Sequence, residues 1–188
     1  MNRVWVLKSA IGLLLLLYPV FIYFGLKEYS PGLLATVIFA MAAIRWAVSR
    51  NDGPLKAYGP YLVMAPALVV GATFITDSNL GLFLYPALVN LVFFVFFSIS
   101  LFYPPTVVEQ LARWRQPDFP SEAISYTTKV TKVWCLFFVI NGALSLLSLQ
   151  LSEEWWLLYN GLIAYLFMGG LFAVEYLVRL RVMSRLYG

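Results

Sequence analysis

Three asparagines are the residues of this sequence whose type and position most suggest a function. Asn90, Asn141 and Asn160 lie deep inside long apolar runs, where a polar side chain is costly unless it finds a hydrogen-bonding partner. Such amides either join neighbouring helices by hydrogen bonds, each worth about 0.6–2 kcal/mol, or line a polar cavity. We favour the hydrogen-bonded interpretation and keep the polar cavity as the alternative.

The remaining residue types give little support for catalysis. The sequence has no histidine and a single cysteine, Cys135, which lies in an apolar run. The patterns G-x-S-x-G, G-x-x-x-x-G-K and H-E-x-x-H are all absent. Only Asp52 and Asp118 are aspartates on the predicted cytoplasmic side, too few for a magnesium-dependent headgroup transferase. We therefore expect no catalytic residues, no metal and no cofactor, and predict that the protein is not an enzyme.

The composition predicts that a lipid bilayer surrounds the asparagines. Of 188 residues, 62% are hydrophobic and 12% are charged, whereas soluble domains carry about 25% charged residues. A soluble fold of this size could not bury so much apolar surface, because its surface is large relative to its volume. Membrane topology accounts for the net charge of +4, so we expect no nucleic-acid partner.

Six stretches are long or nearly long enough to cross a membrane, which takes about 20 mostly apolar residues in a helix. Their continuous apolar character favours helices over barrel strands, in which apolar and polar residues alternate. Pro19, Pro66 and Pro86 lie inside these stretches, where each can kink its helix. We predict an all-α polytopic membrane protein, one domain over residues 1–188, with about six transmembrane helices: 9–26, 31–48, 57–76, 80–103, 133–152 and 155–178.

The basic residues predict the orientation of these spans. With a cytoplasmic N-terminus, Lys27 is the one residue of the 13 lysines and arginines on the outside, which leaves 12 on the inside. This distribution predicts that both termini are cytoplasmic. The first apolar stretch has no small-residue cleavage site after it, so we interpret it as a retained span and not a signal peptide. The basic residues on the inside are Arg3, Lys8, Arg45, Arg50, Lys56, Arg113, Arg115, Lys129, Lys132, Arg179, Arg181 and Arg185.

The one sizeable loop, residues 104–129, is predicted to lie in the cytoplasm. Thr106 and Glu109 have the spacing of a capping box, so we expect a short amphipathic helix to begin there. One face of this helix is predicted to lie in the acyl boundary of the membrane, with arginines at the headgroups: Val107, Val108, Leu111 and Trp114. The loop is also the candidate docking surface for membrane or cytoplasmic protein partners, through Glu109, Arg113, Trp114 and Arg115.

Several motifs follow one another in the second half of the chain: Tyr85-Pro-Ala-Leu-Val-Asn90, Pro104-Pro-Thr-Val-Val-Glu109-Gln-Leu-Ala-Arg113, Gln116-Pro-Asp118, Tyr126-Thr-Thr-Lys-Val-Thr131-Lys-Val-Trp134-Cys-Leu-Phe-Phe138 and Asn141-Gly142. This half resembles a family of small bacterial inner-membrane proteins that are often encoded among fatty-acid-synthase-like genes for aryl-polyene pigments. More distantly, the chain resembles the intracellular septation protein A family of inner-membrane-spanning proteins. The resemblance implies a multi-pass protein of the bacterial inner (cytoplasmic) membrane, near acyl-carrier-linked lipid or pigment synthesis, and implies no catalytic residues.

Three classes of function remain open. We expect a non-catalytic inner-membrane protein that organises or supports envelope or lipid and pigment biogenesis through the loop 104–129. The alternative is a carrier or flippase for a lipid-like or apolar small molecule, and a membrane enzyme of unfamiliar type is the third class. A solid bundle favours the first class, whereas a laterally open polar pocket around the asparagines favours the second. A homo-oligomer is compatible with each class.

Overall fold

The computed structural model describes residues 17–49, 59–76, 78–116 and 119–187, and this part of the chain contains helices and no strand. The elements, in chain order, are α2 (Tyr18–Gly25), α3 (Pro31–Ser49), α4 (Gly59–Thr76), α5 (Leu80–Phe102), α6 (Val107–Arg115), the short 3-10 helix η2 (Ser121–Ala123), α7 (Ile124–Ser148), α8 (Glu153–Leu158), the π-helical segment η3 (Tyr159–Ile163) and α9 (Ala164–Tyr187). The all-α prediction is therefore confirmed for the described residues.

Four helical segments of the described chain are long and apolar enough to cross a membrane: Pro31–Val48, Leu80–Phe102, Ser121–Ser148 and Glu153–Val182. They correspond to the second, fourth, fifth and sixth of the predicted spans. In the third predicted span, the described residues form α4, whose apolar part Val63–Thr76 is shorter than these four segments. Of the first predicted span, 9–26, only the part that forms α2 is described, because residues 9–16 lie outside the described residues.

The boundaries of the last two spans differ from the prediction. Helix α7 begins at Ile124 and ends at Ser148, so the loop before it is shorter and the turn after it comes earlier than expected. Glu153 and Glu154 lie between the predicted spans 133–152 and 155–178, but in the structure they are the first residues of α8. Carboxylates in the first turn of a helix are favourable because they face the positive end of its dipole.

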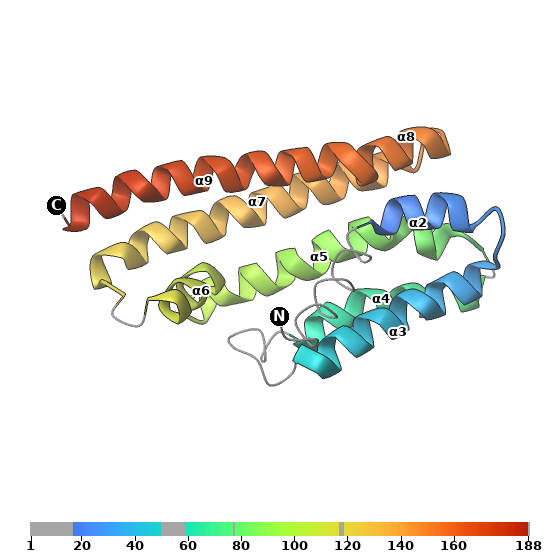
Figure 1. The fold of residues 1–188 in the computed structure, drawn as a ribbon, viewed down its shortest axis with the longest axis horizontal. Coiled ribbons are helices and arrows are strands. Elements are labelled where there is room, and N and C mark those ends of the chain that lie inside the picture. Colours follow the sequence, from blue (N-terminus) through green and yellow to red (C-terminus); the bar gives the residue numbers. More distant parts are fainter. Residues whose placement is uncertain (1–16, 50–58, 77, 117–118, 188) are drawn as a thin grey trace, which may run out of the picture.

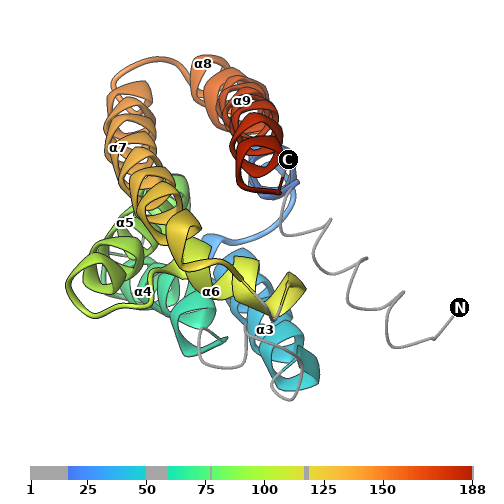
Figure 2. The ribbon, with the colours of Figure 1, turned by 90° about the vertical axis from the view of Figure 1, so that its left-hand side faces the viewer.

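The long helices lie side by side along the long axis of the molecule (Figure 1). Packing follows the chain, since α3 contacts α4, α4 contacts α5, and α5 contacts α7 most extensively. Helix α2 packs against α8 and η3 at one end of the molecule. Viewed from the other end, α6 crosses the bundle between α3 and α7, which it contacts (Figure 2). The short helix therefore lies across the bundle axis, as an in-plane membrane helix would.

The distribution of polar residues in the described chain matches a lipid environment. From Val133 onward the exposed residues of α7 are apolar. The buried side of α7 carries polar residues along its whole length: Thr127, Thr131, Asn141, Ser145 and Ser148. Soluble helices show the opposite pattern, with their polar side in water. Helix α7 is thus suited to a surrounding of acyl chains. Asn141, Ser145 and Ser148 bond to other helices, whereas the hydroxyls of Thr127 and Thr131 donate to backbone carbonyls of α7 itself.

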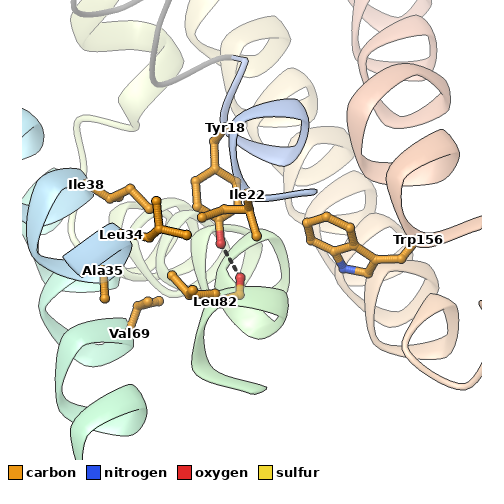
Figure 3. Packing of buried hydrophobic residues seen from close by; sticks show 8 residues of the cluster. All are labelled: Tyr18, Ile22, Leu34, Ala35, Ile38, Val69, Leu82 and Trp156. Carbon is orange, nitrogen blue, oxygen red and sulfur yellow. Dashed lines mark hydrogen bonds between the residues drawn. The ribbon is translucent and has the colours of Figure 1, made fainter. Parts of the chain in front are cut away.

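A compact apolar cluster joins the helices at the end of the bundle where α2 packs against α8. Its members come from α2, α3, α4, α5 and α8, and Figure 3 shows Tyr18 and Ile22 of α2 placed among side chains of α3 and α5. The cluster comprises Tyr18, Ile22, Leu34, Ala35, Ile38, Val69, Leu82 and Trp156. It positions Tyr18 and Trp156 beside the proline of α5, where the candidate site begins.

Candidate functional site: a polar network around Pro86

Pro86 interrupts the backbone hydrogen bonding of α5. A proline has no N–H, so the carbonyl of Leu82, four residues earlier, loses its partner within the helix. The hydroxyl of Tyr18 from α2 donates to this carbonyl, as Figure 3 shows. The next carbonyl, that of Phe83, accepts from the indole Nε1 of Trp156 at 3.1 Å. Side chains of α2 and α8 therefore satisfy the backbone where α5 is broken.

Asn90 continues the network one turn further along α5. Its Nδ2 donates to the carbonyl of Pro86 at 2.8 Å, and its Oδ1 accepts from Nδ2 of Asn141 on α7 at 3.1 Å. The Oδ1 of Asn141 accepts in turn from the hydroxyl of Tyr159 at 2.8 Å. Both asparagines are buried, so these bonds join α5, α7 and the π-helical segment in the interior of the bundle.

Asn160 belongs to a second network on the same side of α7. Its Oδ1 accepts from the hydroxyl of Ser145 at 2.8 Å, and its Nδ2 donates to Oγ of Ser148 at 3.1 Å. The same nitrogen lies 3.0 Å from the carbonyl of Trp156, to which it also donates. Asn160 sits in the π-helical segment, where the widened turn disturbs the backbone pairing of the helix. Its amide therefore fastens an irregular part of the last span to α7.

The chemistry of these networks is that of internal bracing. Each of Asn90, Asn141 and Asn160 accepts a hydrogen bond at its side-chain oxygen and donates at least one from its nitrogen. The partners are hydroxyls, amides and backbone carbonyls, none of which exchanges a proton readily near neutral pH. The arrangement thus supplies structural hydrogen bonds, and the structure links Asn90 directly to Asn141 while Asn160 bonds to other partners.

Tyr18, Trp156 and Tyr159 are members of the network that the sequence analysis did not single out. Aromatic residues with a polar tip are common in membrane helices, so their type alone gave no signal. The spacing of Leu82 and Pro86 offered one, since a mid-span proline always requires a donor for the carbonyl four residues earlier. No sequence pattern known to us would have identified Trp156 as a partner of Phe83.

The loop between α5 and α7 forms the predicted short helix. The hydroxyl of Thr106 accepts from the backbone N–H of Glu109 at 3.3 Å, which confirms the predicted N-cap. The hydroxyl of Ser100, near the end of α5, accepts from the N–H of Val107 at 3.2 Å. The bond between Val107 and Ser100 attaches the start of α6 to the end of α5.

The predicted docking residues do not share one exposed surface. Glu109 is buried, and its Oε1 accepts from the guanidinium of Arg113 at 2.8 Å. The guanidinium of Arg113 also lies 5.5 Å from the ring centroid of Phe119. Trp114 is 63% exposed, while the side chain of Arg115 lies outside the described part of the chain.

The predicted apolar face of α6 is only partly right. Leu111 and Trp114 do share an outward side, but Val107 is buried beside the end of α5 and Glu109 faces inward. The physical reason is the ion pair with Arg113, which neutralises the Glu109 carboxylate and lets it be buried.

Metal binding finds no support among the described residues, which hold no group of three or more histidine, cysteine, aspartate or glutamate side chains placed to share an ion. Comparison with known proteins adds no relative: no family model, no curated protein and no solved structure matches the chain. The fold and the polar network together define the class of protein, which is an α-helical membrane protein with at least four helices suited to cross a bilayer.

Proposed function

We propose that the protein is a non-catalytic integral protein of the bacterial inner membrane that organises or supports envelope or lipid and pigment biogenesis. The observation that carries this proposal is that Asn90, Asn141 and Asn160 are occupied in bonds between helices. Among the buried side-chain nitrogen and oxygen atoms of the described residues, Oγ1 of Thr73 is the one without a partner. A catalytic or transport site needs polar groups that are free to meet a substrate. The asparagines have the bracing role that a scaffold requires.

The proposed topology has six spans and both termini in the cytoplasm. Helix α4 supplies the third span and α2 the end of the first, in addition to the four long segments. Figure 1 supports the orientation, since the end of α3, the start of α4, helix α6 and the end of α9 lie on the same side of the molecule. Most lysines and arginines of the sequence belong to segments on that side, which the positive-inside rule assigns to the cytoplasm.

The proposed contact surface for partners is the outward side of α6 together with the end of α5. Leu111 and Trp114 are exposed on α6, and Phe102 and Tyr103 are among the most exposed large side chains of the described chain. Aromatic residues of this kind are enriched where proteins bind one another. Arg113 borders this surface, although its guanidinium is held by Glu109.

The test is mild detergent extraction of the tagged protein, followed by mass spectrometry of the proteins and lipids that purify with it. We expect reproducible protein partners from the wild-type chain and a loss of at least tenfold in their recovery with Trp114→Ala. Trp155→Ala is the matched control, because Trp155 is 57% exposed at the opposite end of the bundle. If both variants retain their partners, α6 is not the contact surface.

A carrier of a lipid-like molecule is the second candidate function. One observation favours it: the proline break in α5 and the π-helical segment are bridged through Asn141, so irregular parts of two helices meet in the bundle. Irregular helices of this type border substrate sites in transporters. A stoichiometric lipid or polyene that purifies without protein partners, and whose movement Asn141→Leu abolishes at unchanged protein level, would establish this function instead.

A further inference from the structure

Four basic side chains at one end of the α7–α9 pair make no ion pair or hydrogen bond with another described residue: Lys129, Lys132, Arg179 and Arg181. Three of them are exposed, and Arg179 is half-buried. Basic residues elsewhere do have partners, since Arg113, for example, pairs with Glu109 at 2.8 Å. Figure 2 shows this end of the molecule, where α7 begins and α9 ends, toward the viewer. The four positive charges are therefore free to meet a bound anion.

The depth of this end in a bilayer follows from the lengths of the two spans, because a helix of about 20 residues crosses the hydrocarbon core. Lys129 precedes Ser148, the last residue of α7, by 19 residues. Glu175 follows Trp155, near the start of α8, by 20 residues. The hydroxyl of Tyr126 donates to Oε1 of Glu175 at 3.1 Å, so α7 and α9 reach this depth side by side. Lys129 and Glu175 therefore lie at the boundary between the acyl chains and the headgroups.

Tyr126 and Glu175 join α7 to α9 between the basic residues, since the Tyr126 hydroxyl also lies 3.3 Å from the Glu175 carbonyl. Arg179 follows Glu175 by four residues and thus shares its face of α9. Lys129 follows Tyr126 by three residues on α7. Side chains on a helix lean toward its N-terminus. Because α7 and α9 are antiparallel (Figure 1), Lys129 leans toward the headgroups and Arg179 toward the hydrocarbon core, so their charges approach the same depth.

An exposed apolar row on α7 leads from Lys129 into the hydrocarbon core. The row comprises Val133, Leu136 and Ile140. These residues follow Lys129 by four, seven and eleven positions, which is the spacing of one helix face. An acyl chain attached to a headgroup at Lys129 would lie along this row. A dissolved anion would meet only the charges, so the combination of basic and apolar residues favours a lipid.

We propose that this end of the α7–α9 pair binds an anionic phospholipid, with its phosphate between Lys129 and Arg179 and its acyl chains along the apolar row of α7. Lysine and arginine donate charge-assisted hydrogen bonds to phosphate oxygens, and arginine can donate two at once. The carboxylates of η2, α7 and α9 are Glu122, which is exposed, and Glu175, which Tyr126 engages. Against the four basic side chains, these two carboxylates leave a positive excess, which attracts an anionic headgroup more strongly than a zwitterionic one.

This inference goes beyond the proposed function, because neither α6 nor a protein partner takes part in it. It also holds for either orientation of the chain, since both leaflets of a membrane contain phospholipids. Failure of the lipid experiment would therefore leave the contact surface on α6 untouched. Recovery of the same protein partners with Trp114→Ala would overturn that surface without affecting the lipid site.

The test is native mass spectrometry of the full chain in a mild detergent, titrated separately with two lipids. Dioleoyl phosphatidylglycerol and dioleoyl phosphatidylcholine have the same acyl chains, but only the first carries a net negative charge. We expect the wild-type chain to bind one phosphatidylglycerol at least tenfold more tightly than phosphatidylcholine. Lys129→Gln and Arg179→Gln should each lower this preference about fivefold, which is the contribution of one basic residue near an anionic headgroup.

The matched control is Arg181→Gln, which removes the same charge at nearly the same depth. Arg181 is exposed and lies about 160° around α9 from Arg179, so the preference should stay within about twofold of the wild-type value. An equal fall with Arg181→Gln would mean that scattered charge attracts the lipid, and would overturn the site. Equal binding of the two lipids by the wild-type chain, a measurement that needs no variant to fold, would also overturn it. Displacement of phosphatidylglycerol by inorganic phosphate would overturn the assignment to a lipid.

Discussion

At the scale of single residues, the asparagines act through the bonds they make with one another and with hydroxyls. Asn141 occupies the middle of a chain that runs from Tyr159 through Asn90 to the carbonyl of Pro86. Removing one member leaves a buried partner unsatisfied, which costs more than the bond itself contributes. The network is therefore best tested by changing its members singly and together.

Asn141→Leu is expected to destabilise the protein by about 1–3 kcal/mol, because Asn90 and Tyr159 both lose a partner. Asn90→Leu should cost a similar amount, while the double variant should cost clearly less than the sum, since two apolar side chains replace a bonded pair. Unfolding in mixed micelles measures all three values. Strictly additive costs would mean that the two amides do not interact.

Tyr18→Phe removes the hydroxyl that donates to the Leu82 carbonyl and should cost about 1–2 kcal/mol in the same assay. Pro86→Ala restores a backbone N–H for that carbonyl. In the Pro86→Ala background we therefore expect Tyr18→Phe to cost less than half as much. If Tyr18→Phe lowered stability equally in both backgrounds, the Tyr18 hydroxyl would not act by satisfying the carbonyl that Pro86 leaves unpaired.

At the scale of elements, close approach of helices depends on a few glycines. A Cβ on Gly81 would lie 2.6 Å from Oγ1 of Thr73 and 3.1 Å from the carbonyl of Val69, so α4 and α5 could not keep their distance. No such restriction holds at Gly71, where nothing lies within 4 Å. The two glycines form a natural pair of test and control positions in neighbouring helices.

Gly81→Ala is expected to lower stability by about 1–3 kcal/mol, as overpacking at a tight contact does. Gly71→Ala should be neutral or slightly stabilising, because alanine has the better helix propensity and meets no neighbour. Thermal unfolding of the detergent-solubilised variants separates the two. Equal effects at both positions would contradict the described packing of α4 on α5.

Helix α6 shows how local sequence preferences and tertiary contacts together determine an element. Thr106 begins α6 as its spacing from Glu109 predicts, because an N-cap bond is local and needs no tertiary partner. The inward position of Glu109 depends on Arg113 and on the surface beneath α6, which no local rule describes. Local chemistry thus fixed where the helix starts, and packing decided which side it buries.

At the scale of the whole molecule, the distribution of charge makes the proposed topology testable. Glu154 lies at the end of the bundle assigned to the outside, and Ser184 near the end of α9 assigned to the cytoplasm; both are exposed. On a Cys135→Ser background, Glu154→Cys should react with a membrane-impermeant maleimide in cells whose outer membrane has been made permeable. Ser184→Cys should react only after the inner membrane is opened. The reverse pattern would invert the proposed orientation.

The sequence by itself determined that the chain is helical and apolar enough for a membrane, and it placed α3, α5 and α6 closely, because apolar length and capping are local properties. It also identified Asn90, Asn141 and Asn160 as residues that need partners. Only the tertiary structure decided that Asn90 meets Asn141, that Tyr18 and Trp156 complete the break at Pro86, and that Asn160 lies in a π-helical segment. The physical reason is that hydrogen bonds between helices depend on rotation and depth along the bundle, which are fixed jointly by all the helices that pack together.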